Sequence, residues 1–379
     1  MRLAYAALAE IPSERANTIQ VMKVCQSLAQ LGHAPTLLLP DQAVDASGRD
    51  WDSLAARYGL QTRFEIEWLR LPWGRRGLFA CRAALRARRL GARALYVRAA
   101  PLAVCGLLAG LPVLLEMHEL PCGQFGPRWY RLFLSLPGRK RVLAISQALL
   151  LRLEEEYRTA PSGGMLNAPD GVDLERYAGL PEPEAARRSL GLAPGATVLC
   201  TGHLYAGRGV PLFLELASRL PQVNFVWAGG RPQEVEQWRA RAEGLALHNL
   251  TFTGFIPNRL IPGYQAAADV LLMPYERRIS VSGGGNTADF CSPLKMFEYM
   301  ASGRAILSSD LPVLREVLDE STAVFCRPED ADGWAAALTG LLADGERRQA
   351  LGRRARQAVE PYAWTARSRR VLEGFLEAA

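Results

Sequence analysis

The chain alternates short apolar runs with amphipathic stretches of helical length, and this alternation restricts the folds open to it. Near the start, residues 1–8 (MRLAYAAL), 17–32 (NTIQVMKVCQSLAQLG) and 34–40 (APTLLLP) predict a strand, a helix that stops at a glycine, and a second strand. Strands that alternate with helices in this way are typical of βαβ units, in which helices cover a parallel sheet. The beginning of the chain therefore predicts a parallel α/β fold.

The same alternation continues along the chain and restarts after a proline-rich stretch at 180–196 (LPEPEAARRSLGLAPGA). A chain of 379 residues is also too long for one ordinary core. We therefore expect two doubly wound domains, residues 1–180 and 181–361. The further predicted strands lie within 94–100, 112–120 and 141–156 in the first half, and within 197–205, 224–230, 250–255, 269–275, 305–309 and 323–328 in the second.

The cysteines and the longest apolar segments indicate a cytoplasmic protein. The seven cysteines are scattered and form no Cys-x-x-Cys pair, which argues against a disulfide framework and against a structural zinc site. The apolar run at the N-terminus is interrupted at Glu10 and is too short for a signal peptide. No segment reaches the roughly 18 apolar residues of a membrane span.

The excess positive charge lies in the first half of the chain. Residues 1–180 hold 23 Lys and Arg against 16 Asp and Glu, whereas residues 181–379 hold 22 of each. The segment 63–98 has ten arginines and two glutamates, interleaved with Trp68, Trp73 and Phe79. Such a segment is suited to peripheral contact with the inner face of an anionic membrane, or to contact with a phosphorylated acceptor. A solvated, arginine-rich helix face is an equal alternative, and no motif for a nucleic-acid partner accompanies the charge.

Residues 201–216 (TGHLYAGRGVPLFLEL) form the first candidate site, because ligands of doubly wound sheets bind at the carboxyl ends of the strands. A strand is expected to end at Gly202 and a helix to begin near Val210. Gly202 and Gly209 permit close approach of the backbone, and the helix N-terminus offers unpaired N–H groups to an anion. Arg208 adds a positive charge. The alternative is an ordinary strand-to-helix turn.

Residues 291–307 (CSPLKMFEYMASGRAIL) form the second candidate site. Ser292 and Pro293 are typical of a helix start, so the amides near Leu294 are expected to point outward. Lys295 in the first turn opposes the helix dipole unless an anion lies between them. Glu298 shares the face of Lys295 and is suited to accept hydrogen bonds from a sugar diol. The alternative is an exposed ion pair between these two residues.

Together the two segments predict a diphosphate held by two helix N-termini and two cations, with a carboxylate at a sugar diol. This is the pattern of a nucleotide-sugar site. It requires the donor substrate and no further cofactor.

At this point the sequence resembles a known family, the retaining family-4 glycosyltransferases of the GT-B fold. The resemblance implies two Rossmann-like doubly wound domains that face a central cleft, with residues 362–379 forming a helix that returns to the first domain. It also implies transfer of a hexose from a UDP- or GDP-linked sugar to a hydroxyl by front-side attack; the acceptor is a glycan, a lipid-linked molecule or a small molecule. No Asp-x-Asp appears in the context of a metal site, so we expect the transfer to need no metal. The segments that carry the resemblance are 13–33, 96–100, 114–120, 168–177, 201–210, 253–275, 292–303, 309–318 and 362–368.

The resemblance also assigns roles to residues of the donor site. His203 and Arg208 fall where the family places two cations for the donor diphosphate, and Lys295 and Glu298 match the Pro-Leu-Lys-x-Phe-Glu-Tyr-Met-Ala helix of a subgroup, with Glu298 expected on the donor ribose. Many members have a glutamate where this chain has Phe290. Either the neighbouring Asp289 or the amides after Ser292 are expected to take over its contacts.

In the first half, the resemblance places His118 beside the transferred sugar, at the end of the apolar strand PVLLEM. We expect His118, Arg208 and Lys295 to act in catalysis. Arg98 and Glu119 are expected on the acceptor side or in simple ion pairs. Asn17 and Thr18 lie in the first loop, which GT-B enzymes bring against both substrates.

Two other functions fit the same residues. A sugar-nucleotide epimerase of similar fold binds the same diphosphate but needs no acceptor. A non-catalytic scaffold that keeps the fold and binds nucleotide sugars is consistent with the departures at His203 and Phe290.

Overall fold

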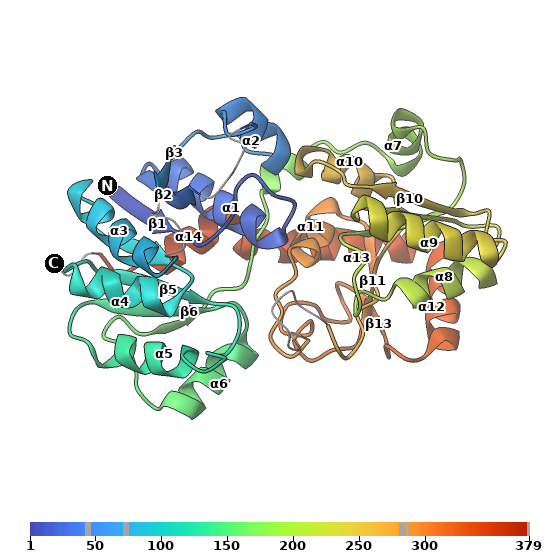
Figure 1. Cartoon of the computed structure of the whole chain (residues 1–379). Coiled ribbons are helices and arrows are strands. Elements are labelled where there is room, and N and C mark those ends of the chain that lie inside the picture. Colours follow the sequence, from blue (N-terminus) through green and yellow to red (C-terminus); the bar gives the residue numbers. More distant parts are fainter. Residues whose placement is uncertain (42–46, 71–75, 280–285, 287, 377–379) are drawn as a thin grey trace. The chain divides into compact units, whose positions relative to one another are not determined.

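A computed structural model describes residues 1–41, 47–70, 76–279, 286 and 288–376. The chain forms two compact units: Met1–Asp170 together with Trp364–Ala379, and Gly171–Ala363. Each unit is built on its own parallel sheet with helices on both faces (Figure 1). None of the helices in the described ranges combines the length and the apolar character needed to cross a membrane.

The first unit contains the strands β1–β7 and the helices α1–α6, and the last helix of the chain, α14, completes it. In chain order these elements are β1 (Arg2–Ala6), α1 (Ala16–Gln30), β2 (Ala34–Asp41), α2 (Trp51–Tyr58), β3 (Glu65–Arg70), α3 (Arg76–Arg89), β4 (Leu95–Val97), α4 (Ala100–Leu108), β5 (Val113–Met117), α5 (Gly126–Ser135), β6 (Lys140–Ala144), α6 (Gln147–Tyr157), β7 (Met165–Asn167) and α14 (Trp364–Leu372).

The sheet of the first unit has the order β3-β2-β1-β4-β5-β6-β7, and all its pairs are parallel. Strand β1 pairs with β2 on one side and with β4 on the other, so the chain changes direction across the sheet at β1. The helices α3, α4 and α5 pack in succession, whereas α14 packs against α1. The loops at the carboxyl ends of β1 and β4 therefore lie at the point where the strand order reverses, and the end of β5 is beside that of β4.

The sequence pattern does not predict the two outer strands of this sheet, β3 and β7. Strand β3 has the sequence EIEWLR, and all its residues are at least partly exposed because it pairs only with β2. An edge strand of this kind carries charged side chains and lacks the continuous apolar run of a buried parallel strand. Strand β7 has three residues, none of them fully buried.

The second unit contains β8–β13, the helices α7–α13 and three short 3-10 turns. In chain order its elements are η1 (Leu174–Tyr177), α7 (Pro183–Leu190), β8 (Thr197–Thr201), α8 (Val210–Arg219), β9 (Asn224–Ala228), α9 (Pro232–Gly244), β10 (Leu250–Gly254), η2 (Asn258–Leu260), α10 (Ile261–Ala266), β11 (Val270–Met273), α11 (Leu294–Ser302), β12 (Ala305–Ser309), β13 (Val324–Cys326), α12 (Ala331–Ala343), α13 (Gly345–Ala358) and η3 (Glu360–Tyr362).

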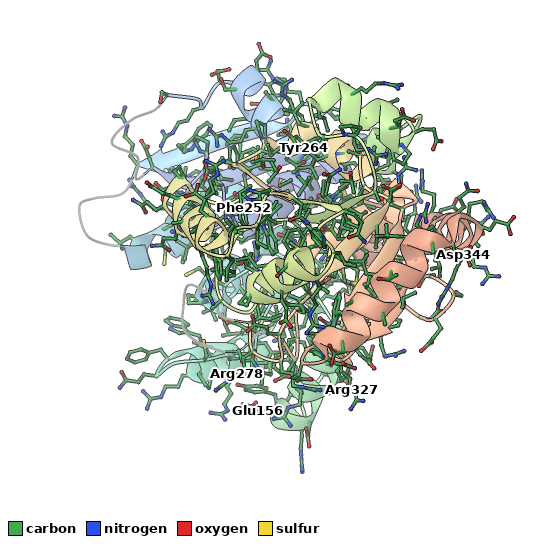
Figure 2. The ribbon with its side chains drawn as sticks, turned by 90° about the vertical axis from the view of Figure 1, so that its right-hand side faces the viewer. Glu156, Phe252, Tyr264, Arg278, Arg327 and Asp344 are labelled. Atoms are coloured by element: carbon green, nitrogen blue, oxygen red, sulfur yellow. The ribbon has the colours of Figure 1, made fainter. Side chains whose placement is uncertain are left out.

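The sheet of the second unit has the order β10-β9-β8-β11-β12-β13 and is also parallel. Alternate strand residues face opposite sides, so Leu199 and Leu271 enter one core while Val198 and Val270 enter the other. Helices α8, α9 and α12 cover the second of these cores, and α10, α11 and α13 cover the first. In Figure 2, Asp344 marks the turn between α12 and α13, where its side chain accepts a hydrogen bond from the amide of Arg347 at 2.9 Å.

The division between the units lies between Asp170 and Gly171, whereas the sequence pattern places the domain boundary at residue 180. Residues 171–180 belong to the second unit because they bond to it: the backbone N–H of Val172 donates to Tyr362 at 3.1 Å, and the hydroxyl of Tyr177 donates to Gln265 at 2.9 Å. The proline-rich stretch is instead part of α7 and the turns beside it.

Candidate functional site

The turn between β8 and α8 is shaped by glycines. Gly209 has φ 78° and is the N-cap of α8. A Cβ at Gly209 would lie 1.7 Å from the carbonyl oxygen of Pro274, and one at Gly207 would lie 2.3 Å from that of Arg278. These two glycines therefore let the turn pack directly on the chain that follows β11. Gly202 is exposed at the end of β8, and the nearest atom to a Cβ built there is Nζ of Lys295, at 3.9 Å.

Arg208 is held within this turn by two tyrosines. Its guanidinium donates to the hydroxyl of Tyr275 at 2.8 Å and to that of Tyr205. The guanidinium carbon also lies 4.6 Å from the ring centroid of Tyr205 and 5.2 Å from that of Tyr275. Contacts of this kind orient the positive charge without neutralising it.

Lys295, in the first turn of α11, is buried, with 8% of the residue exposed. Its Nζ lies 3.5 Å from Sγ of Cys200, 4.9 Å from the ring centroid of Tyr275 and 5.8 Å from that of Trp227. Burial lowers the pKa of Lys295, and Cys200 offsets part of this effect. Lys295 is therefore not part of an exposed ion pair with Glu298.

Arg208 and Lys295 thus both approach one ring, that of Tyr275, whose centroid lies 5.2 Å from the guanidinium carbon and 4.9 Å from Nζ. Each cation also acts electrostatically on the thiol of Cys200, whose pKa is raised by burial and lowered by both positive charges. Within the described part of the chain, no carboxylate pairs with either cation. Two like charges brought together without a counter-ion are unfavourable by themselves, and an anion between them removes the penalty.

Two helix N-termini accompany these cations. Helix α8 begins after Gly209 and α11 begins after Pro293, and these two N-cap residues have no side-chain acceptor for the first amides of their helices. The sequence pattern proposes Ser292 as the N-cap of α11, but Ser292 lies one residue before it. Because the first amides of a helix have no partner within the helix, both ends are suited to an anion.

The other residues predicted for the donor site have contacts of their own. The ring of His203 stacks on that of Tyr205, with centroids 5.8 Å apart. Glu298 accepts a hydrogen bond from Nε2 of Gln265 at 3.2 Å, which holds the carboxylate on the α10 side of α11. Asp289 is exposed in the turn that precedes α11, and Leu294 is the first residue of the helix.

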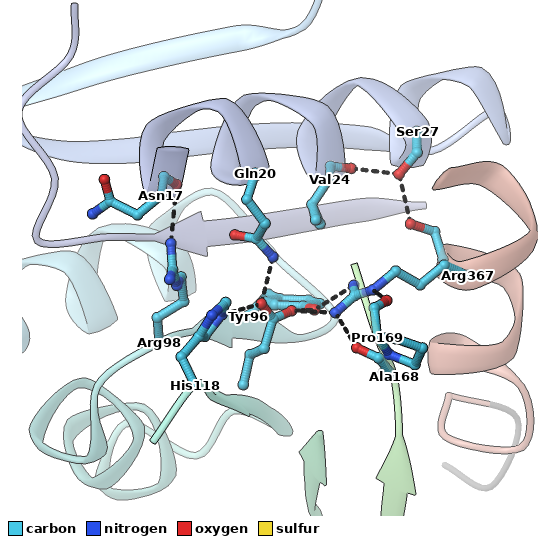
Figure 3. Close-up of polar contacts among 12 residues, drawn as sticks. Asn17, Gln20, Val24, Ser27, Tyr96, Arg98, His118, Ala168, Pro169 and Arg367 are labelled. Atoms are coloured by element: carbon cyan, nitrogen blue, oxygen red, sulfur yellow. Dashed lines mark hydrogen bonds and ion pairs between the residues drawn. The ribbon is translucent and has the colours of Figure 1, made fainter. Parts of the chain in front are cut away.

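In the first unit, His118 lies in a polar cluster at the carboxyl end of β5 (Figure 3). Its Nε2 lies 2.6 Å from Oε1 of Glu116, a fully buried carboxylate in β5. Arg367 of α14 also reaches Glu116, at 2.8 Å, and Gln20 and Tyr96 donate to the same carboxylate. Burial and the charge of Arg98 lower the pKa of His118 to about 4.

The acceptor-side candidates of the first unit are only partly brought together. Arg98 donates to the backbone oxygen of Asn17 at 3.0 Å, so these two residues are neighbours (Figure 3). Asn17 and Thr18 lie in the first turn of α1, whereas the sequence-based prediction places them in the loop before it. Thr18 is buried, and its hydroxyl donates to the backbone oxygen of Arg15 at 2.7 Å. Glu119 is exposed, and its partner is the thiol of Cys122 at 3.7 Å.

Several residues around these groups are absent from the sequence-based predictions: Tyr205, Tyr275, Cys200, Glu116 and Arg367. One of them gives a signal in the sequence, because a glutamate inside the apolar strand VLLEM must be buried and therefore needs a partner. The partner cannot be identified from the pattern, because Arg367 is 251 residues away along the chain.

Comparison with known proteins finds similarity to glycosyltransferases over part of the chain. A family model described as "Glycosyl transferases group 1" matches residues 195–344. A GDP-mannose-dependent alpha-(1-6)-phosphatidylinositol monomannoside mannosyltransferase of Mycolicibacterium smegmatis is 31% identical over 226 residues, which are 56% of this chain and 56% of that protein. A D-inositol 3-phosphate glycosyltransferase of Nocardia farcinica is 27% identical over 63% of this chain and 54% of its own length. The chain thus matches about half the length of each of these relatives.

The fold is shared with solved structures along nearly the whole chain. A sucrose-phosphate synthase from Thermosynechococcus elongatus has a TM-score of 0.72 at 18% identity and covers 97% of both chains. A glycosyltransferase from Rickettsia africae has a TM-score of 0.77 at 13% identity and covers 100% of both. The chain therefore has the GT-B fold of two Rossmann-like parallel-sheet units, and the stretch that forms its second sheet matches the group 1 glycosyltransferases.

Proposed function

We propose that this protein is a glycosyltransferase that moves a hexose from a nucleoside diphosphate sugar to an acceptor hydroxyl. The observation that carries the proposal is the pair Arg208 and Lys295, two cations that meet at Tyr275 beside two helix N-termini. A diphosphate supplies the negative charge that this arrangement lacks. The match to group 1 glycosyltransferases supports the same assignment.

The proposed reaction is a transfer with retention. The bond between the anomeric carbon and the leaving phosphate oxygen breaks while the acceptor oxygen bonds to the same face of that carbon. The acceptor proton passes to the leaving diphosphate oxygen. In this scheme Arg208, Lys295 and the helix amides stabilise the charge that grows on the diphosphate, which is where a preformed positive site lowers the barrier most.

The other residues have roles in binding. Glu298, which already accepts a hydrogen bond from Gln265, is proposed to accept hydrogen bonds from the ribose diol. Gly202 lies beside Lys295 and allows the diphosphate to approach the backbone, whereas Gly209 shapes the turn. His203 and Asp289 are proposed to contact the donor, and His118 the transferred sugar, with Asn17 and Arg98 on the acceptor side.

Binding of nucleoside diphosphates tests the donor site directly. We expect GDP or UDP to raise the melting temperature of the protein, and GDP is the first choice because a relative is named for GDP-mannose. Arg208→Ala and Lys295→Ala should each weaken binding by about tenfold to a hundredfold, since each removes a charged hydrogen bond. Arg259→Ala, on η2 and exposed, is the control. If the nucleotide raised the melting temperature of the wild type and of all three variants equally, the proposed site would be refuted.

Product analysis separates the rival functions. With donor alone, an epimerase changes the sugar, whereas a transferase at most hydrolyses it slowly. With a mixture of candidate acceptors, mass spectrometry should show addition of one hexose, and NMR of the product should show the anomeric configuration of the donor. Activity that survives EDTA would support the proposed metal independence. Nucleotide binding without turnover of any donor would favour the scaffold.

We also propose that the first unit contacts an anionic membrane surface, but through a wider face than the segment 63–98. Within that segment Arg86 pairs with Glu67 at 2.7 Å, and Arg88 donates to the backbone oxygen of Ala109. These two arginines of the segment therefore bind within the protein itself. The neighbouring helices α4 and α5 add exposed apolar side chains. The exposed residues of this face are Leu78, Arg82, Leu85, Arg89, Leu108, Phe125, Arg128, Trp129, Arg131 and Leu132.

This face combines the two features that bind bilayers, apolar side chains and positive charge without acidic neighbours on α3, α4 or α5. Vesicles rich in phosphatidylglycerol should therefore retain the protein in a sedimentation assay, whereas vesicles of phosphatidylcholine should retain much less. Replacing Trp129 and Leu132 by serine should lower retention. Leu245→Ser is the control, because Leu245 is 55% exposed in the second unit. Equal retention by both kinds of vesicle would contradict the proposal.

A further inference from the structure

The carboxylate of Glu116 is the centre of a buried network in the first unit. Its Oε1 accepts from Gln20 and lies 2.6 Å from Nε2 of His118; its Oε2 accepts from Tyr96 and from Arg367, the latter at 2.8 Å. Glu116 is 0% exposed and Arg367 is 1% exposed. An ionised carboxylate has about four acceptor positions, and here all of them are occupied.

Arg367 ensures that Glu116 stays ionised. Burial by itself raises the pKa of Glu116, but the charge of Arg367 and the hydrogen bond to His118 lower it well below its usual range. Arg367 is itself fixed, because it also donates to the backbone oxygens of Pro169 at 2.8 Å and Ala168 at 3.0 Å (Figure 3). The network therefore presents His118 with an oxygen that only accepts hydrogen bonds.

A histidine beside an obligatory acceptor must carry its proton on the nitrogen that faces it. We propose that Glu116, held by Arg367, fixes His118 as the neutral tautomer protonated at Nε2, so that Nδ1 is a hydrogen-bond acceptor for a substrate hydroxyl. Glu116 and Arg367 are then positioning residues. This inference rests on the proposed function for the identity of the substrate, and on the geometry of the first unit for the tautomer.

The other charged groups near His118 are compatible with a neutral ring. Burial and the charges of Arg98 and Arg367 lower the pKa of His118, whereas Glu116 raises it. The lowering effects are the larger, so the ring is neutral. The remaining titratable groups of the network, Tyr5, Tyr96 and Asp170, surround Glu116, and burial raises the pKa of each. Asp170 reaches a pKa of about 7 because burial and the charge of Glu116 both disfavour its ionised form.

The first test is made on the unaltered protein. The ¹⁵N chemical shifts of the two ring nitrogens distinguish the tautomers, and His118→Gln identifies the signal among the four histidines. Between pH 6 and pH 8 we expect a signal of the Nε2-protonated form. A ring protonated at Nδ1, or a rapidly exchanging mixture, would overturn the proposal without any other variant.

The second test changes the acceptor. In Glu116→Gln the single amide oxygen is expected to face Arg367, so the amide NH₂ group faces His118 and forces the ring proton onto Nδ1. The ring signal should then change tautomer. The kcat for transfer should fall by about tenfold to a hundredfold, with little change in KM for the donor. Glu154→Gln, an exposed glutamate of α6, is the matched control.

A third variant keeps the test decisive if Glu116→Gln fails to fold. Arg367→Lys retains a positive charge beside Glu116, so His118 should keep its tautomer even though the bonds of the guanidinium to Pro169 and Ala168 are lost. A changed tautomer in Arg367→Lys would show that Glu116 does not act through its charge. In Glu116→Gln, an altered tautomer with unchanged kcat would refute the role in transfer.

Nucleotide binding separates this inference from the proposed function. GDP or UDP binding depends on Arg208 and Lys295 in the second unit, so Glu116→Gln should bind the nucleotide as the wild type does. If the wild type binds no nucleotide, the proposed function fails while the tautomer of His118 is still decided by NMR.

Discussion

Arg367 Nη2 lies 2.8 Å from Glu116 Oε2, which joins the last helix of the chain to a strand 251 residues earlier. Both side chains are buried, so each depends on the other for its charge to be tolerated. Next to this pair, the hydroxyls of Ser27 in α1 and Ser368 in α14 are 2.6 Å apart (Figure 3). Helix α14 is therefore an integral part of the first unit.

Removing Arg367 should destabilise the first unit strongly. Arg367→Met leaves Glu116 buried and ionised without its partner, which costs about 3–5 kcal/mol of unfolding free energy. The double variant Glu116→Gln/Arg367→Met should recover part of this loss, because it no longer contains the unpaired charge. Urea denaturation measures both, and additive effects of the two changes would contradict the pairing. Deleting residues 362–379 should abolish activity for the same reason.

Replacing Lys295 should separate stability from binding. The lysine is buried without a carboxylate partner in the described part of the chain, so Lys295→Met should raise the unfolding free energy of the free protein by on the order of 1 kcal/mol. The same change should abolish the thermal shift caused by a nucleoside diphosphate. Calorimetry with and without GDP or UDP measures both effects.

Lys140 is the matched control for this change. It is also buried, but it donates to the backbone oxygens of Phe133 at 2.9 Å and Leu134 at 2.6 Å, at the end of α5. Lys140→Met should therefore lower stability and leave the nucleotide-induced shift intact. Destabilisation by both substitutions would mean that Lys295 is satisfied within the protein.

A methyl group at Gly209 should disrupt the turn before α8. Gly209→Ala places its Cβ 1.7 Å from the oxygen of Pro274 at a φ of 78°, so we expect a loss of at least about 2 kcal/mol in unfolding free energy and loss of nucleotide binding. In Gly263→Ala, within α10, a Cβ has no atom within 4 Å, and the change should stabilise slightly. Thermal denaturation of the two variants should therefore give shifts of opposite sign.

His118 and Asp170 should give opposite pH dependences of stability. The pKa of His118 is about 4 in the folded protein against about 6.5 when unfolded, so between these values only the unfolded state binds the proton and stability rises with pH. The pKa of Asp170 is about 7 in the folded protein against about 3.9 unfolded, so between these values only the folded state binds the proton and stability falls as pH rises. In the wild type the two effects oppose each other between about pH 4 and pH 6.5.

Two variants separate these contributions. Relative to the wild type, His118→Gln should give a stability that falls more steeply with rising pH, and Asp170→Asn one that rises more steeply, by up to about 1.4 kcal/mol per pH unit in each case. Urea denaturation at pH values between 4.5 and 6.5 measures the slopes. Parallel curves for the three proteins would show that neither group titrates as the structure indicates.

The sequence by itself determined the two parallel sheets, because buried strands such as VLLEM and VLLM are short apolar runs between helices and their burial requires covered faces. It also determined where α8 begins and where α11 ends. Gly209 before α8 and Gly303 after α11 both adopt the left-handed conformation that glycine favours. The sequence pattern did not predict the outer strand β3, because this edge strand has no continuous apolar run.

Only the tertiary structure decided which side chains meet. The pattern places Arg208 and Lys295 at the starts of two helices, but Tyr275, which both cations contact, lies in the segment that follows a third element, β11. The partner of Glu116 likewise comes from the far end of the chain. Periodicity along a sequence reports which face of an element is buried, whereas contacts between distant elements depend on how the sheet and its helices close together.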